Sequence, residues 1–100
     1  MFSKLKDYLR EVQIGDSIWE IKFVRKIPKE PETTIGLCDP SEHVIYIRLG
    51  QSPEQRFKTF IHELCHAVCY EYAIPECHKV IYALEEPILR LFSDNGVIDL

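Results

Sequence analysis

The sequence predicts an α+β fold in which a three-stranded antiparallel sheet and a short N-terminal helix precede two longer helices. Two segments, 53–72 and 76–93, place apolar residues at helical spacing, whereas residues 17–25 alternate between apolar and polar side chains. Glycine and proline separate these segments at the positions expected of turns. One hundred residues, 46% of them hydrophobic, suffice for one core, so we expect a single domain over residues 1–100.

The first two elements follow from a change of period near Gly15. Residues 2–13 carry apolar side chains at near-helical spacing, with Ser3 as a cap, and are predicted to form an amphipathic helix. Gly15-Asp16 is expected to end it. Residues 17–25 then predict a strand whose core-facing side carries Trp19, Ile21 and Phe23.

Two further strands are predicted at residues 33–38 and 43–49. The intervening Asp39-Pro40-Ser41-Glu42 places proline at the second position of a turn, where its fixed φ is favourable. The two strands are therefore expected to form a hairpin, which completes an antiparallel sheet with the strand at 17–25.

The helix at 53–72 has the clearest start in the chain. Ser52 is a good N-cap, Pro53 suits the first helical position, and Gln55 completes a capping box. Its predicted core face consists of Phe57, Phe60, Ile61, Leu64 and Val68.

The last helix is predicted over residues 76–93 and ends before Asn95-Gly96. Pro87 lies inside it and is expected to kink or restart the helix, because its ring clashes with the preceding turn. The predicted core stripe consists of Val80, Ile81, Leu84, Ile88, Leu91 and Phe92.

A His-Glu-x-x-His pattern lies on the helix at 53–72. In a helix, His62 and His66 lie about 40° apart around the axis and about 6 Å apart along it, so both rings project from one face. Two imidazoles in this arrangement can bind one Zn²⁺ ion, and Glu63 is then placed to hold the water of the metal. The alternative is a solvated surface with no metal.

A zinc site needs a third protein ligand, and the last helix offers two carboxylates for it. Helix periodicity favours Glu85, which borders the apolar stripe, over Glu86, which lies nearly opposite Leu84. His78, twelve residues after His66, is a further candidate if the turn at residue 75 folds it back. The thiol of Cys69 is also near the metal face, although a structural cysteine is the plainer interpretation. His43 is interpreted as a residue of the sheet face.

The segment His62-Glu63-Leu64-Cys65-His66-Ala67 resembles the His-Glu-x-x-His-Ala signature of zincin metallopeptidases. The order of elements over residues 33–95 is similar to that of small zincin-like proteins, many encoded by phages or prophages, related in outline to the ImmA/IrrE and SprT-like groups. The resemblance implies a minimal zincin-like fold. It also implies Glu86 as the third ligand, from its distance beyond His66, with Pro87 where these proteins have glycine.

The function expected from the motif is that of a zinc-dependent metallopeptidase. A zinc-bound water, activated by Glu63 as general base, would hydrolyse a peptide bond of a protein or peptide substrate. We expect an extended peptide along the strand edge at 44–49. Tyr70 or His78 could donate to the oxyanion, although a structural role is the plainer interpretation of both. The alternative function is a zinc-stabilised protein-interaction module without proteolysis.

Bulk properties exclude other classes of function. The net charge of −4 disfavours non-specific nucleic-acid binding, which requires a basic surface. No run is apolar enough for a membrane span and the N-terminus lacks the apolar stretch of a signal peptide, so we expect a cytoplasmic protein without membrane contact. The oligomeric state is left open. The four cysteines are expected to be free structural thiols. They are Cys38, Cys65, Cys69 and Cys77.

Overall fold

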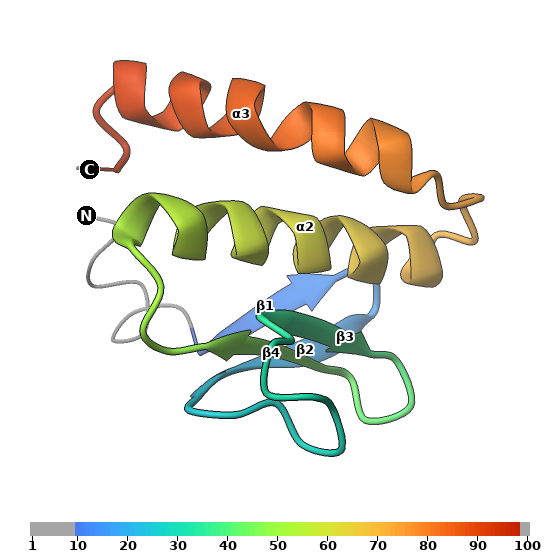
Figure 1. Cartoon of the computed structure of the whole chain (residues 1–100). Helices are drawn as coiled ribbons and strands as arrows, with labels where there is room; N and C mark the ends of the chain where they lie inside the picture. Colours follow the sequence, from blue (N-terminus) through green and yellow to red (C-terminus); the bar gives the residue numbers. More distant parts are fainter. Residues whose placement is uncertain (1–9, 99–100) are drawn as a thin grey trace.

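The structure is a computed structural model that describes residues 10–98, and it consists of a sheet covered by two stacked helices. Figure 1 shows α2 lying across one face of the sheet and α3 lying on the far side of α2. Within the described range the elements are, in order, β1 (Glu11–Ile14), β2 (Ser17–Val24), β3 (Gly36–Asp39), β4 (Val44–Arg48), α2 (Pro53–Glu71) and α3 (His78–Asp94).

The sheet differs from the predicted one in strand number and in direction. The part of the chain that the structure describes forms a four-stranded mixed sheet of order β1-β2-β4-β3, in which β2 and β4 are parallel. The prediction of a three-stranded antiparallel sheet is therefore wrong. The predicted β3–β4 hairpin does form, but it docks with β4 against β2. This order buries β4, whose Val44, Ile45 and Ile47 are the most apolar run in the sheet.

The prediction of an N-terminal helix over residues 2–13 is wrong at its C-terminal end. Glu11–Ile14 is strand β1, which pairs antiparallel with β2. Gly15 and Asp16 form the two-residue hairpin loop between them, with Gly15 at φ 59°. The apolar spacing of such a short segment is compatible with a helix and with a strand. The hairpin turn at residues 15–16 selects the strand. Residues 2–9 lie outside the described range.

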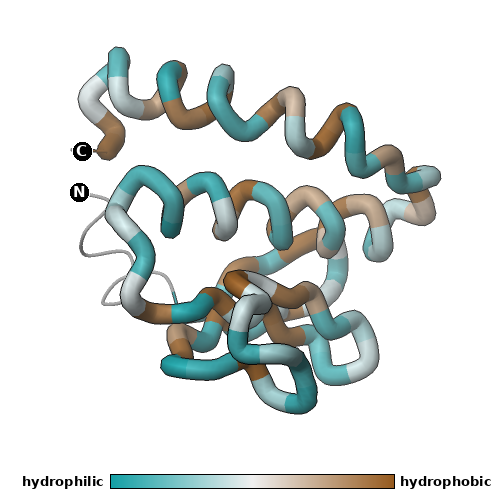
Figure 2. The backbone as a smooth tube through the Cα atoms, viewed as in Figure 1, coloured by the Kyte–Doolittle hydropathy of each residue, from teal (hydrophilic) through white to brown (hydrophobic). Residues whose placement is uncertain are grey.

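The predicted helix at 53–72 is confirmed by α2. The Ser52 Oγ accepts a hydrogen bond from the backbone N–H of Gln55 at 3.1 Å, and Pro53 occupies the first turn. Its apolar face packs on the sheet around the fully buried side chains of Trp19, Ile45 and Ile47. In Figure 2 hydrophobic stretches accordingly run along the strands beneath α2.

The last helix, α3, is continuous from His78 to Asp94 and includes Pro87 without ending there. Its predicted core stripe is only partly buried, because α3 packs chiefly on α2 and covers none of the sheet. Ile88 and Phe92 pack against the core, whereas Val80, Leu84 and Leu91 are exposed. Only Ile81 and Leu89 of α3 are buried within the described residues. Neither α2 nor α3 is long and apolar enough to cross a membrane.

A partly buried carboxylate joins the C-terminal end of α2 to the sheet. Glu71 accepts hydrogen bonds from the Trp19 indole N–H at 2.8 Å and from the Ser17 hydroxyl at 3.0 Å. The His43 Nε2 lies 3.3 Å from the same carboxylate, and its ring contacts that of Trp19 at a tilt of 40°, with 5.0 Å between the ring centroids. Because these groups come from β2 and from the β3–β4 turn, Glu71 fixes the end of α2 that leads to α3.

We expect Glu71→Ala to lower the free energy of unfolding by about 2 to 4 kcal/mol, because the buried indole N–H of Trp19 loses its acceptor. Urea denaturation measures this change. Glu20→Ala is the matched control, since Glu20 makes only an exposed ion pair with Lys22 at 3.8 Å, and its effect should stay within about 0.5 kcal/mol. Equal effects of the two substitutions would contradict this account.

Candidate metal centre

Three histidine rings gather between α2 and α3, and the Nε2 atom of His66 lies close to those of the other two. The Nε2 atoms of His62 and His66 are 3.2 Å apart, and those of His66 and His78 are 3.0 Å apart. One ligand atom from each ring lies within 4.8 Å of the others, which is close enough for all three to bind one metal ion. Histidine rings that only pack on one another have no need to place their ring nitrogens this close together. The arrangement therefore suits a common bound ion.

The chain reverses after α2 in a way that carries His78 back over His66. Two of the three rings come from consecutive turns of α2 and therefore share a face. The helix ends with Ala73 at φ 53° and a hydrogen bond from the Ile74 N–H to the Cys69 carbonyl at 2.9 Å. The chain then enters α3 at Cys77, so that His78 is the first residue of the returning helix.

Two of the rings are held from behind by carboxylates. The Nδ1 of His62 lies 2.9 Å from Glu85 Oε2, and the Nδ1 of His66 lies 2.9 Å from Glu76 Oε1. A carboxylate only accepts, so each Nδ1 is the donor, and in a neutral ring the Nε2 then carries a lone pair. Carboxylate–histidine pairs of this kind orient metal-binding imidazoles in proteins.

The facing lone pairs of His62 and His66 repel each other unless a cation lies between them. The ring of His78 can donate its own Nε2–H to His66, but this leaves the His62–His66 contact uncompensated. A single proton can bridge two of the rings, whereas a metal ion accepts a lone pair from all three. Nitrogens bound to one tetrahedral zinc ion lie about 3.3 Å apart, given Zn–N bonds of about 2.0–2.1 Å. The separations of 3.2 Å (His62–His66) and 3.0 Å (His66–His78) fit such an ion, and the ligand atoms of all three rings lie within 4.8 Å of one another.

The two predicted third ligands lie at different places around this group. The Glu86 carboxylate is exposed and pairs with Lys58, with 3.6 Å between Oε1 and Nζ. Glu85 reaches the group, but it contacts the outer nitrogen of His62 rather than the point where the Nε2 atoms meet. His78, which the sequence offered as an alternative, is the third member among residues 10–98.

Glu63 is a buried carboxyl beside this group, with 8% of its surface exposed. Burial raises its pKa to about 7, and the nearby Glu85 adds to the rise, whereas His66 and a hydrogen bond from the Cys38 backbone act in the opposite direction. A carboxyl with a pKa near neutrality both takes up and releases protons at physiological pH. It therefore has the property that a general base needs.

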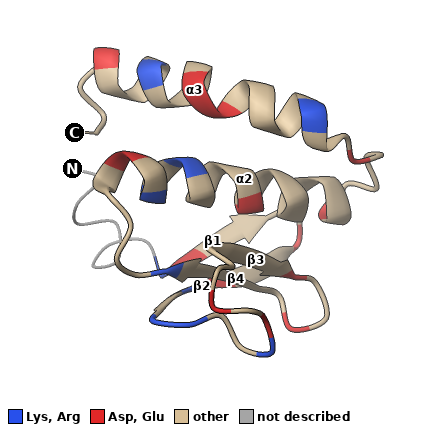
Figure 3. Ribbon diagram, viewed as in Figure 1, with Lys and Arg blue, Asp and Glu red and all other residues tan. Residues whose placement is uncertain are grey.

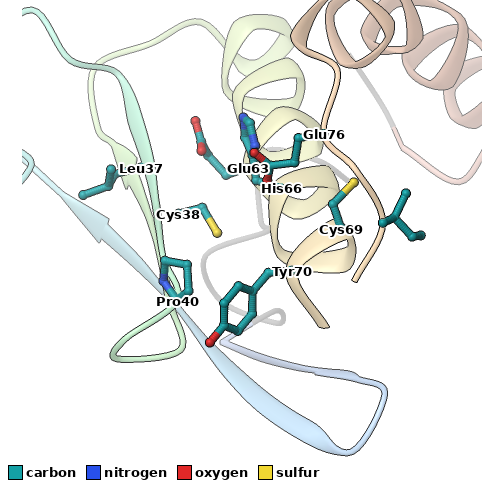
Figure 4. Close-up of a pocket in the computed structure, with 9 residues that line it drawn as sticks. Leu37, Cys38, Pro40, Glu63, His66, Cys69, Tyr70 and Glu76 are labelled. Carbon is teal, nitrogen blue, oxygen red and sulfur yellow. Dashed lines mark hydrogen bonds and ion pairs between the residues drawn. The ribbon is translucent and has the colours of Figure 1, made fainter. Parts of the chain in front are cut away.

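Two pockets meet at Glu63, which lines both. One has a volume of about 430 Å³. It is bounded by Leu37 and Cys38 of β3, by Pro40 just after this strand, and by His66 and Tyr70 of α2 (Figure 4). The other, of about 320 Å³, is bounded by residues 33–36, with His62 from α2 and Tyr82 from α3. Both pockets border β3 and share Glu63, so they form a groove along this strand, with His66 in one half and His62 in the other.

The strand that borders this groove is not the predicted one. The segment 44–49 was expected to offer its edge to a peptide, but β4 lies between β2 and β3 and has no free edge. Within the described residues, β3 is the edge strand on the side of the metal centre, which corrects the prediction. Its outer edge faces the groove.

The four cysteines, all within the described range, are free thiols as predicted. Cys38 lines the larger pocket, where burial first and the charge of Glu63 second raise the pKa of its thiol to about 12. Burial also raises the pKa of Cys65. Thiols held in the neutral form are poor metal ligands, and none belongs to the cluster of metal-binding groups found in residues 10–98.

Sequence reasoning missed Glu76 and Gly36, which position the centre without belonging to the motif. Glu76 precedes His78 by two residues. Its signal in the sequence is a carboxylate near a predicted histidine ligand, because such carboxylates often hold the Nδ1 of the ligand. Gly36 has no chemical signature in the sequence, because its role depends on a close approach across the groove.

Comparison of the chain with models of protein families, with curated proteins and with solved structures finds no match. The assignment of the centre therefore depends on the geometry described above.

Gly36 has no side chain, and the carboxylate of Glu63 occupies the space where a side chain would begin. A Cβ at this position would lie 2.6 Å from the Thr59 methyl and 2.9 Å from Glu63 Oε2. We expect Gly36→Ala to lower the free energy of unfolding by about 1 to 3 kcal/mol, measured by urea denaturation, because the backbone of β3 must move away from α2. The additional substitution Thr59→Ser removes the methyl but keeps the hydroxyl, and should restore part of the loss. No recovery in the double variant would contradict the clash.

Proposed function

We propose that His62, His66 and His78 bind zinc and that the chain is a zinc-dependent peptidase with Glu63 as its general base. The observation that carries the proposal is the convergence of three Nε2 atoms beside a buried carboxyl whose pKa is about 7. The position of Glu63 one residue after His62 brings the proton acceptor and the metal ligands to the same face of α2.

The donor set supports zinc over the common hard cations. Three neutral imidazoles suit zinc, whereas magnesium and calcium prefer oxygen ligands. Three protein ligands leave a fourth position open, as catalytic zinc sites require. Bound there, zinc would supply a Lewis acid that polarises a carbonyl and lowers the pKa of water.

The residues of the chain supply the remaining parts of hydrolysis. Glu63 takes the proton of the attacking water and then delivers it to the leaving amine, so the proton passes through one carboxyl. The free edge of β3 can pair with the backbone of an extended peptide, which would lie along the groove and pass the histidines. Tyr70 and Tyr82 line the groove on opposite sides of Glu63, where a hydroxyl can donate to the oxyanion.

A second candidate function is a zinc-stabilised protein-interaction module without proteolysis. The observation that favours it is the placement of α3, which packs chiefly on α2 and contributes His78 to the centre. A metal bound by both helices would therefore clamp α3 in place whether or not catalysis occurs. The two functions differ in whether Glu63 is needed.

The ligand set is tested by metal affinity. Loss of a carboxylate that orients a histidine ligand typically lowers metal affinity by about 10- to 100-fold. His78→Ala removes a ligand itself, so we expect it to lower the zinc affinity by more than about 100-fold. Competition titration with a zinc-binding dye measures the affinity. Glu86→Gln is the matched control and should leave it unchanged. The reverse result would assign the third ligand to Glu86, as the family resemblance implies.

Catalysis is tested by Glu63→Gln in the zinc-loaded protein. The amide has nearly the same shape but cannot accept the proton, so we expect peptide hydrolysis to fall by about 100-fold or more. A mass-spectrometric digest of a peptide library measures it, and zinc content is measured on the same sample. Cleavage at parental rate by this variant would remove Glu63 from the mechanism. Absence of zinc-dependent cleavage by the parent would leave the interaction module.

A further inference from the structure

The flank of α3 that borders α2 carries an apolar surface that the proposed metal centre does not use. Val80, Leu84 and Leu91 belong to the stripe predicted for the core, but 54%, 41% and 58% of their surfaces are exposed. With Ile88 they define what we call the α3 stripe. The stripe lines a groove of about 560 Å³ between α2 and α3, whose opposite wall includes Ile61, Leu64 and Val68.

This groove is distinct from the metal centre. On α3, His78 and Glu85 project about 100° or more around the axis from Leu84, by the geometry of the helix. On α2, the groove is lined by side chains at other angles than His62 and His66. A partner in the groove would therefore approach the molecule from a different side than a peptide on β3.

Contiguous apolar surface of this kind marks an interaction site on small proteins. Its walls are almost entirely hydrophobic, and the exposed Ile74 extends them at the end where α2 turns into α3. The exposed side chains are large and lie on one helix, so a second helix can bury several of them at once.

The stripe is complementary to itself when two copies of α3 run antiparallel. With the two-fold axis between Leu84 and Ile88, Leu84 of one copy faces Ile88 of the other. The same register places Val80 near Leu91 of the second copy. A symmetric interface of this type needs one patch only, since each residue meets its counterpart twice.

The charges at the two ends of α3 favour the same arrangement. Lys79 lies near the start of the helix and Asp94 at its end, where it pairs with Arg90 at 3.7 Å, and both residues are exposed. Figure 3 shows a basic position near the start of α3 and an acidic one at its end. In the antiparallel register Lys79 of one copy comes close to Asp94 of the other, at both ends of the interface. A parallel pairing would bring like charges together and align the helix dipoles, both of which are unfavourable.

We propose that the α3 stripe is the interface of a symmetric homodimer, in which α3 of each copy packs antiparallel against the groove of the other. The proposal does not depend on metal binding or on proteolysis, because it rests on side chains outside the metal centre. It assigns a role to Val80, Leu84 and Leu91, which the sequence predicted to be buried and which a single copy leaves exposed.

The test is the mass of the zinc-loaded full-length chain, measured by sedimentation over a range of concentrations. The parent is expected at the dimer mass. Leu84→Glu and Leu91→Glu each place two charges in the interface and should raise the dissociation constant by about 100-fold or more. The matched control is Ile18→Glu, which adds the same charge to a β2 side chain that is 54% exposed, and it should remain dimeric. Circular dichroism and zinc content confirm that each variant is folded.

The direction of pairing is tested by charge reversal. Lys79→Glu and Asp94→Lys should each weaken the dimer by about two- to fivefold per ion pair, and the double variant should regain the parental affinity. A parent that is monomeric into the millimolar range would overturn the proposal and point to another protein in the groove. Dissociation by Ile18→Glu as readily as by Leu84→Glu would also overturn it, and so would a double variant weaker than either single one.

Discussion

The interaction on which the site depends is the contact of histidine lone pairs between α2 and α3. The carboxylates of Glu76 and Glu85 hold the Nδ1 protons of His66 and His62, and this turns the two Nε2 lone pairs toward each other. Such a contact is unfavourable in the protein alone and favourable around a cation. Because His78 comes from the other helix, the same cation would also hold α3 against α2.

The proton acceptor is placed by the opposite side of the molecule. Glu63 lies between α2 and β3, and the absence of a side chain at Gly36 gives its carboxyl room there. The low polarity of this position raises the pKa of Glu63, whereas the Cys38 backbone limits the rise. The proposed metal ligands and the proposed base thus depend on different neighbours: α3 packs beside His62 and His66, and β3 packs beside Glu63.

How much the sequence predicts depends on how local each feature is. The cap at Ser52 and the spacing of His62 and His66 are properties of one helix, and α2 and its motif follow from them. Strand order and the third histidine depend on contacts between distant segments, which periodicity does not encode. The Gly15-Asp16 hairpin and the insertion of β4 beside β2 decided the sheet. The reversal of the chain at Ala73 brings His78 back to His66.

The two sides of α3 are physically coupled because the helix has few other supports. Its contacts are chiefly with α2, so its position is fixed by the Ile81 and Leu89 packing, by the centre at His78 and by whatever covers the α3 stripe. A ligand that orders α3 on one side lowers the cost of ordering it on the other. In the proposed dimer, zinc would by reciprocity strengthen dimer formation by the same factor by which the dimer would strengthen zinc binding. The two proposals would then describe parts of one equilibrium, although the stripe and the histidines share no ligand.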